Sequence, residues 1–459
     1  MNFTDPIFFL LFPILTGTTA ILRRFRLWET EKLLLIVAGF GVLFTYGSAD
    51  LLVFLCVGLG NYAVGTWLNR ATGARRTMLL VLVIAADLTG LAYFKYFSFL
   101  VANVLRIPRA TTPAAVVIPL GISFYTFHVI SYQIDLHRRR IVHARPIDFA
   151  LYLSLFPHVI AGPIVRGSQL IPQIVRPSER QALVSKGLFY FIVGLFLKRF
   201  CADHIGAVID PFWTADGARN LSASAGWTVV WLYYCQIYAD FAGYSSMAIG
   251  MAYLLGYVFP ENFRAPMTAS SLRDFWRRWH MTLSSWLRDY LYIPLGGSHH
   301  GLTRAVASLV ITMVLGGLWH GAGWTFIVWG LIHGICLGIE RFVWNPVAER
   351  RWWSAALGLV LTQACVLIAW VFFRAPAFDV AAVMLRSIAG LSGASPAFPR
   401  DLAMVAPLAL PVIAHNVLTR IGDDKLLRLP WLAGALCGVL LALLVVFPSS
   451  SSLFIYYTF

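Results

Sequence analysis

The stretch that decides the fold reads SLRDFWRRWHMTLSSWLRDYLYIPLGG at residues 271–297 and MVLGGLWHGAGW at residues 313–324. Its first half predicts one amphipathic helix, because a serine followed by Asp274 in the first turn favours a helix start. The helix is expected to end at Pro294 and the two glycines that follow it. Spacings of 4, 3, 4 and 4 residues predict a cationic stripe on one helix face, formed by Arg273, Arg277, His280, Ser284 and Arg288.

The composition is that of a membrane protein. Of the 459 residues, 59% are hydrophobic and 12% are charged, and the mean hydropathy is +0.73. Only helices and closed barrels satisfy the backbone in lipid, and these apolar runs are too long for barrel strands. We therefore predict an all-α, polytopic integral membrane protein in contact with lipid, with about 11–12 membrane helices plus re-entrant or amphipathic segments.

The net charge and the cysteines indicate which kinds of partner and ligand the protein can bind. The net charge of +15 fits basic loops and an anionic partner, but no soluble basic domain exists to bind nucleic acid. The six cysteines lie in or beside apolar runs without a CxxC pair, which indicates packing residues and predicts no metal site. The first six residues lack a basic region, so no cleavable signal is expected.

Basic clusters follow the apolar runs at 7–21, 51–68 and 118–134. If the spans alternate simply, these clusters share one side, which the positive-inside rule assigns to the cytoplasm, and this places the N-terminus outside. Residues 149–164 contain prolines and His158 and predict a broken or re-entrant segment. We expect one membrane domain over 1–459, divided into N-terminal helices at 1–105, a core at 119–340 and C-terminal helices at 353–459.

His320 is the first candidate catalytic residue. It ends an apolar run of membrane length, where a polar side chain is costly, and the glycines around it permit the close backbone approach of a narrow passage. An imidazole is suited to general-base catalysis, because its pKa lies near neutral pH. The alternative, a structural hydrogen bond between helices, is equally compatible with a lone histidine. No GxSxG motif is present, so direct deprotonation of an acceptor alcohol is simpler than an acyl-serine.

His280 is the second candidate, since its predicted face also carries Arg277 and Ser284 and could orient a thioester or polarise its carbonyl. An interfacial histidine is the alternative. The neighbouring arginines could clamp phosphates, as guanidinium geometry allows, or could meet lipid headgroups, which we favour for Arg273. The expected donor-binding residues are Arg277, Arg278, Trp276, Ser284 and Arg288.

Asp240 and Gln236 share one face of a long apolar segment. A carboxylate inside a membrane usually has a partner, and an arginine of the 271–288 helix is the expected one. We assign a supporting role to Asp240, Gln236, Tyr238 and Trp319. Asp87, His128, Asp135 and His333 are weaker candidates of the same kind. For His333 a core role is favoured, although its position one helix after His320 leaves a functional role open. His158, His299 and His300 are expected in loops.

Several of these segments resemble signatures of the membrane-bound O-acyltransferase family, in particular its bacterial branch that acts in alginate O-acetylation. The similar segments are DFWRRWHMTLSSWLRDYLYIPLGG at 274–297, LGGLWHGAGWTFIVWGLIHG at 315–334, QIYADFAGYSSMAIG at 236–250, PLGISFYTFHVISYQID at 119–135 and FPHVIAGPIVR at 156–166.

The resemblance implies a helical fold around a central tunnel, with His320 as the catalytic histidine and His280 as the second polar position of the family. It also implies an enzyme of the bacterial inner membrane that passes an acyl group, commonly acetyl from acetyl-CoA, towards an exported polysaccharide, often with a periplasmic partner acyltransferase. The competing interpretations are D-alanyl transfer from a carrier protein to teichoic acid, a polysaccharide transporter or flippase, and a structural scaffold. A transporter would need charged residues along a pathway and preferably paired repeats.

Overall fold

A computed structural model describes residues 3–105, 117–159, 162–298, 301–343, 352–392 and 398–449. These residues form helices and connections without a β-strand, so the predicted all-α class is confirmed. They divide into two compact units, which we describe separately. Unit 1 comprises Met1–Phe191 with Met247–Pro260, and unit 2 comprises Ile192–Ser246 with Glu261–Phe459.

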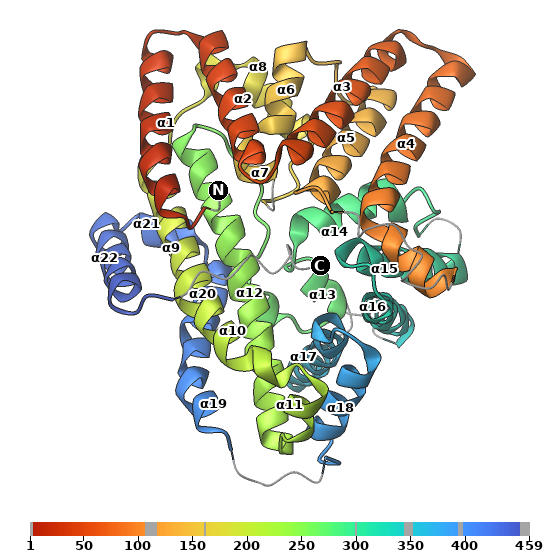
Figure 1. Ribbon diagram of the computed structural model, residues 1–459, viewed down its shortest axis with the longest axis vertical. Helices are drawn as coiled ribbons and strands as arrows, with labels where there is room; N and C mark the ends of the chain where they lie inside the picture. The colour runs from red at the N-terminus through yellow and green to blue at the C-terminus, as the bar shows by residue number, and fades with distance from the viewer. Residues whose placement is uncertain are drawn as a thin grey trace. The chain divides into compact units, whose positions relative to one another are not determined.

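Unit 1 is built around one buried helix. This helix, α5 (Ile122–His137), buries almost every side chain because α3, α4 and α8 pack against it. In Figure 1 the long helices α1 to α4 lie in front of the shorter helices α6 and α8. The other helices of unit 1 are α1 (Pro6–Arg24), α2 (Trp28–Phe44), α3 (Ser48–Arg70), α4 (Gly73–Phe99), α6 (Pro146–Ser154), α7 (Phe156–Val159) and α8 (Gly167–Val175), with the first part of α9 (Val184–Leu195).

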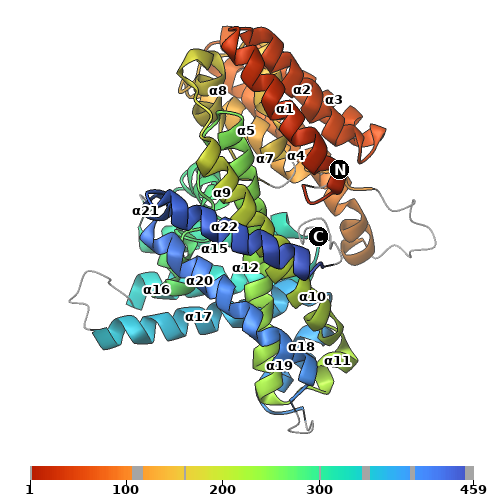
Figure 2. The same ribbon diagram turned by 90° about the vertical axis from the view of Figure 1, so that its left-hand side faces the viewer.

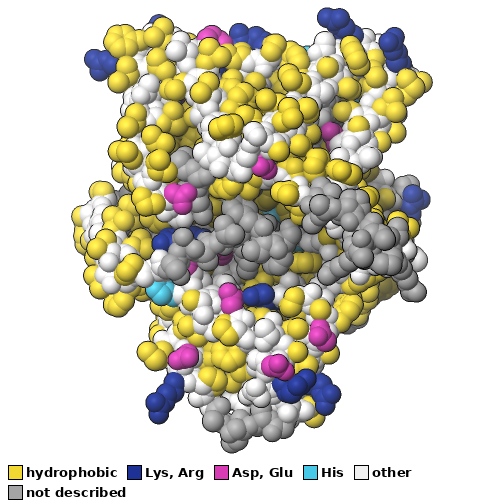
Figure 3. Space-filling view, viewed as in Figure 1, with side chains coloured by type: hydrophobic (Ala, Val, Ile, Leu, Met, Phe, Trp, Pro, Cys, Tyr) yellow, Lys and Arg dark blue, Asp and Glu magenta, His cyan; other side chains and the backbone are white. Residues whose placement is uncertain are grey.

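The three basic clusters lie at one end of unit 1. Arg76, at the start of α4, donates to the carbonyl oxygen of Leu136 at the end of α5, over 2.7 Å. Arg145, shortly after α5, binds Glu29 at the start of α2 over 2.8 Å. Figure 3 shows Lys and Arg side chains at this end, above a surface of apolar side chains. Within unit 1 these parts of the chain therefore lie near one another, while their common side of the membrane stays a prediction.

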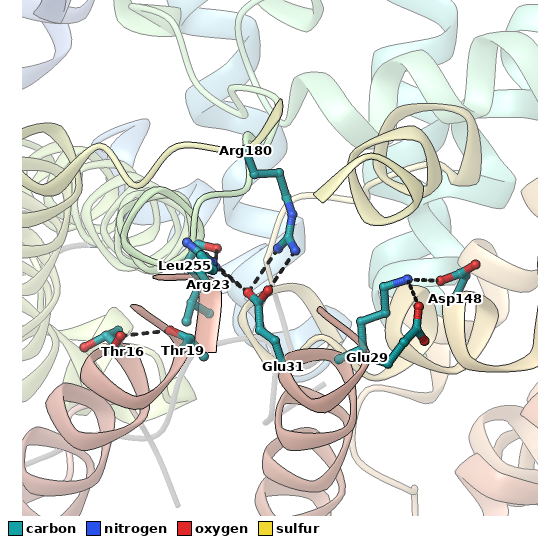
Figure 4. Close-up of polar contacts among 9 residues, drawn as sticks. Thr16, Thr19, Arg23, Glu29, Glu31, Asp148, Arg180 and Leu255 are labelled. Carbon is teal, nitrogen blue, oxygen red and sulfur yellow. Dashed lines mark hydrogen bonds and ion pairs between the residues drawn. The ribbon is translucent and has the colours of Figure 1, made fainter. Parts of the chain in front are cut away.

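Buried ion pairs hold this end together (Figure 4). Glu31 of α2 is 0% exposed and accepts from Arg23 of α1 at 2.6 Å and from Arg180, in the connection between α8 and α9, at 2.9 Å. Beside it, Lys32 binds Asp148 of α6 over 2.6 Å. Charges buried at this depth require partners, so these pairs fix α1, α2 and α6 to one another.

The segment at 149–164 is broken, as predicted. Helix α6 ends at Ser154, the short α7 follows, and residues 162–166 are non-helical and mostly buried. The expectation that His158 lies in a loop is wrong. His158 lies in α7 and is 0% exposed. Its buried nitrogens have partners, since Nε2 lies 3.0 Å from the carbonyl oxygen of Tyr152 and Nδ1 lies 3.4 Å from His128 Nε2.

Unit 2 contains the decisive stretch and is centred on α12 (Ala223–Leu254), which begins in unit 2 and ends in unit 1. Most side chains of α12 in unit 2 are fully buried. The other helices of unit 2 are α10 (Asp203–Ile209), α11 (Ala215–Arg219), α13 (Leu272–Trp276), α14 (Met281–Leu287), α15 (Leu302–His320), α16 (Trp324–Val343), α17 (Trp352–Arg374), α18 (Phe378–Ile388), α19 (Arg400–Val405), α20 (Ala409–Ile421), α21 (Asp423–Leu427) and α22 (Pro430–Val446).

Glycines bring α15 and α16 into close contact. A Cβ atom at Gly330 of α16 would lie 2.3 Å from the carbonyl oxygen of Met313, and one at Gly317 of α15 would lie 2.3 Å from that of Phe326. Such small-residue contacts are typical of helix pairs in membranes. Helix α17 then runs beside α16 (Figure 2). The end of α15, where His320 lies, is thus held against α16.

Seven helices among the described residues are long and apolar enough to span a membrane, and α22 is a shorter apolar helix. The predicted multi-pass character is therefore confirmed. The number is below the expected 11–12 because several predicted spans are short or interrupted. Helices α2 and α5, for example, have 17 and 16 residues.

Candidate active site

The decisive stretch begins as predicted but does not continue as one helix. Ser271 Oγ accepts from the backbone N–H of Asp274 over 3.1 Å and caps α13. The chain then turns at His280, whose φ of 42° and ψ of 52° are left-handed, before α14 and a π-helical turn, η7 (Arg288–Tyr292), follow. The continuous helix over this stretch is thus a wrong prediction.

Asn262 explains the break. Its Oδ1 accepts from the Thr282 backbone N–H at 3.2 Å and from the Thr282 hydroxyl at 2.9 Å, which satisfies the first turn of α14. His280 Nδ1 lies 3.0 Å from the same oxygen, and the imidazole is 0% exposed. His280 therefore does not share a face with Arg277 and Ser284, which line a cavity that His280 does not reach.

The two candidate histidines lie close together in the core of unit 2. The ring centroids of His280 and His320 are 6.3 Å apart, and His320, at the end of α15, is 3% exposed. Phe241 packs against His280 at 4.6 Å, and Trp329 and Phe373 pack against His320 at 5.2 and 5.3 Å. Burial lowers the pKa of His280 to about 3, so this imidazole is neutral at physiological pH.

A cavity of about 670 Å³ lies among α13, α14, η7, α15 and α16. Four of the expected donor-binding residues line it, and so do two further arginines. The polar and aromatic lining residues include Trp276, Arg277, Ser284, Arg288, Arg273 and Arg341. The guanidinium group of Arg277 makes no ion pair with the residues that the structure describes, whereas that of Arg288 binds Asp289 over 2.6 Å. The cavity therefore offers cationic groups to an anionic ligand.

Arg278 and Arg273 differ from the expectations. Arg278 does not line the cavity and instead binds Asp274 over 2.8 Å and the carbonyl oxygen of Arg264 over 3.4 Å. Arg273, for which we favoured lipid headgroups, lies at the cavity. The break between α13 and α14 explains both positions, because Arg278 belongs to the turn and Arg273 to α13.

The cavity and the histidines are connected through two helices. Met313 of α15 lines the cavity and precedes His320 by two helical turns, about 10 Å at 1.5 Å per residue. On α16, Leu337 lines the cavity and Trp329 contacts His320. The ring of Trp276, a cavity residue, lies 5.8 Å from that of Trp329, so aromatic contacts lead from the cavity towards His320.

His333 lies along this path. It is 0% exposed, and its ring lies 5.2 Å from that of Trp276 and 5.0 Å from that of Trp329. Neither ring nitrogen has a hydrogen-bond partner among the described residues. A buried imidazole without partners is costly, which is unusual for a residue with only a core role.

Asp240 has a partner other than the expected one. Its carboxylate binds Lys198 over 2.5 Å, and Lys198 also binds Asp203 over 2.8 Å. The lysine belongs to a π-helical turn, η4 (Phe196–Ala202), which approaches α12 closely at Gly243. The predicted pairing with an arginine of the 271–288 stretch is therefore wrong, because α12 presents Asp240 to η4.

The other supporting residues occupy separate positions in unit 2. The side-chain amide of Gln236 packs against Gly206, and the Tyr238 hydroxyl lies 3.1 Å from His415 Nδ1. Only Trp319 lies beside the histidines, with its ring 6.2 Å from that of His280. Of the weaker candidates, Asp87 accepts from Asn61, Asp135 lies 3.9 Å from Arg140, and His299 and His300 lie outside the described residues.

Sequence reasoning missed Asn262, Lys198 and Arg341. Asn262 lies in a non-helical connection 18 residues before His280, so no helical periodicity relates the two. Lys198 and Arg341 each end an apolar run, where a basic residue is ordinarily interfacial. No local signal could have identified Asn262 as the partner of His280, Lys198 as the partner of Asp240, or Arg341 as a residue of the cavity.

The membrane-bound O-acyltransferase family matches residues 120–353, which include both histidines and the whole cavity. The chain belongs to this family. It is therefore an enzyme, a membrane-bound O-acyltransferase, which sets aside the transporter and scaffold interpretations.

Three relatives of known class show which acyl-transfer reactions occur in similar proteins. The probable alginate O-acetylase AlgI of Pseudomonas putida is 38% identical over 397 residues, or 84% of this chain and 79% of the relative. The peptidoglycan O-acetyltransferase of Helicobacter pylori is 34% identical over 417 residues, or 84% of this chain and 75% of the relative. The teichoic acid D-alanyltransferase of Streptococcus thermophilus is 28% identical over 286 residues, or 55% of this chain and 68% of the relative.

Proposed function

We propose that the protein transfers an acetyl group from acetyl-CoA, bound from the cytoplasm, to a hydroxyl group of an exported polysaccharide or of a periplasmic partner acyltransferase. The enzyme would lie in the bacterial inner membrane with its N-terminus in the periplasm. The basic end of unit 1 supports this orientation, because basic loops favour the cytoplasm.

The observation that carries the proposal is the separation between the arginine-lined cavity and His320, about 10 Å along α15. A donor that binds the arginines through phosphates and reacts at His320 needs a long arm between its charged part and its acyl group. Coenzyme A has this construction. Arg277 and Arg288 would bind its phosphates, and Trp276 and Ser284 would contact the arm where it leaves the cavity.

In the reaction, the acceptor hydroxyl oxygen forms a bond to the acyl carbon and the carbon–sulfur bond breaks. His320 takes the hydroxyl proton and returns it to the leaving thiolate, so the products are an ester and a free thiol. His280 assists His320 in this step. Trp319 packs against the His280 ring, and Asp240, Gln236 and Tyr238 support α12. No metal ion is required by this scheme.

The acetyl group is favoured over D-alanine because the two O-acetylating relatives match 84% of this chain, whereas the D-alanyltransferase matches 55%. A phosphopantetheine arm on a carrier protein has the same chemistry as the coenzyme A arm, so D-alanyl transfer to teichoic acid is the second candidate.

The test is thioester turnover by the purified protein in nanodiscs. Labelled acetyl-CoA and a labelled D-alanyl carrier protein are supplied in parallel to the wild type, to His320→Ala and to His137→Ala, a control histidine at the end of α5. We expect acetyl-CoA turnover that is lost in His320→Ala and retained in His137→Ala. Full activity of a folded His320→Ala variant would contradict the role of His320. If the enzyme turns over only the D-alanyl carrier protein, then that carrier protein, and not acetyl-CoA, is the donor.

A further inference from the structure

Asn262 has a fixed side-chain orientation inside unit 2. The residue is 1% exposed, its Nδ2 donates to Ser245 Oγ over 3.0 Å, and its Oδ1 faces both donors of Thr282. A backbone N–H can only donate, so the atom of Asn262 that it contacts must be the oxygen. The amide therefore presents its carbonyl oxygen to His280.

This orientation determines the tautomer of His280. Because the Asn262 oxygen can only accept, His280 Nδ1 carries the proton in their 3.0 Å hydrogen bond. A neutral imidazole has one donor and one acceptor nitrogen, so Nε2 carries a lone pair. His280 Nε2 is buried and makes no hydrogen bond with the residues that the structure describes.

The backbone at this point is held by the same residue. His280 has a φ of 42°, a conformation that is strained for a non-glycine residue and that clusters at functional sites. The backbone N–H of Met281 donates to the carbonyl oxygen of Asn262 over 2.9 Å. Asn262 thus holds both the main chain and the ring of His280 in place.

We propose that Asn262 is a positioning residue that keeps His280 Nε2 unprotonated, so that His280 accepts a hydrogen bond from the acceptor hydroxyl. This inference rests on the proposed function and refines the role of His280 within it. In this tautomer Nε2 cannot donate to a thioester carbonyl, so His280 orients the nucleophile instead. The ring centroids of His280 and His320 are 6.3 Å apart, so a hydroxyl group that His280 orients lies beside the ring that takes its proton.

The tautomer is measured by solid-state NMR on the full chain in lipid, labelled with ¹⁵N-histidine. The His280 signals are identified by their loss in His280→Gln. We expect a protonated Nδ1 and an unprotonated Nε2 in the wild type. In Asn262→Ala we expect a shift towards the Nε2–H form and an acetyl transfer rate lowered about 10- to 100-fold, the range found when hydrogen-bond partners of metal-bound histidines are removed.

Thr282→Val is the matched control. It removes a different hydrogen bond to the same Asn262 oxygen and leaves the bond to His280. We expect it to retain the tautomer and to lose less activity than Asn262→Ala at a comparable fall in unfolding temperature. If Asn262→Ala does not fold, Asn262→Ser, whose shorter side chain withdraws the accepting oxygen from His280 Nδ1, should shift the tautomer in the same direction.

An Nε2–H form in the wild type, or an unchanged tautomer in Asn262→Ala, would overturn the inference. These signals do not depend on turnover. If the wild type has the expected tautomer but His320→Ala keeps full activity, the proposed function fails while the effect of Asn262 on the ring remains.

Discussion

The buried carboxylate of Glu31 should be among the most sensitive positions for stability. In Glu31→Gln the side chain keeps its shape but loses its charge, which leaves Arg23 and Arg180 facing each other. Their side chains are 13% and 3% exposed, so water cannot replace the carboxylate. Removing one partner of a buried ion pair costs about 3–5 kcal/mol, and we expect the lower part of this range because the amide oxygen still accepts.

The neighbouring Glu29 provides the control on the same helix (Figure 4). Glu29 also has two cationic partners, Lys32 at 3.3 Å and Arg145 at 2.8 Å, but its side chain is 55% exposed. Ion pairs accessible to water contribute about 0–1 kcal/mol, so Glu29→Gln should be nearly neutral.

Denaturant titration in detergent, followed by tryptophan fluorescence, measures both variants against the wild type. We expect a clear fall in the midpoint for Glu31→Gln and almost none for Glu29→Gln. Equal midpoints for the two variants would refute the argument that burial decides the contribution of these pairs.

Further predictions concern helix packing, the cavity and a buried histidine. Gly330→Ala should lower the free energy of unfolding by about 1–3 kcal/mol, because its Cβ would meet the backbone of α15. Gly434→Ala, with no atom within 4 Å of its Cβ, should be neutral or slightly stabilising, and thermal unfolding measures both. Arg277→Gln should raise the KM for acetyl-CoA about 10-fold or more through the loss of a charged hydrogen bond. Arg278 lies outside the cavity, so Arg278→Gln should leave this KM unchanged. An equal rise of the KM in both variants would contradict the cavity as the donor site. His333→Phe should raise the unfolding temperature, since it removes two unpartnered nitrogens, and a lowered temperature would mean that they are bonded.

Helical class, multi-pass character and the position of His320 could be predicted from the sequence alone. Each depends on local properties. A run of apolar residues becomes a helix in lipid because the backbone has no other partner, and His320 ends such a run. The Ser271 cap was also predictable, because the cap and the N–H that it binds are three residues apart.

Only the tertiary structure decided how the site is assembled. The periodicity of residues 271–293 is helical, yet Asn262 binds both His280 and the first turn of α14 and so breaks the helix between Arg277 and Met281. This turns the imidazole towards His320 and leaves the arginines on the cavity. Asp240 likewise pairs with a lysine of η4. These partners are distant along the chain, and packing, which no local pattern encodes, determines which of them meet.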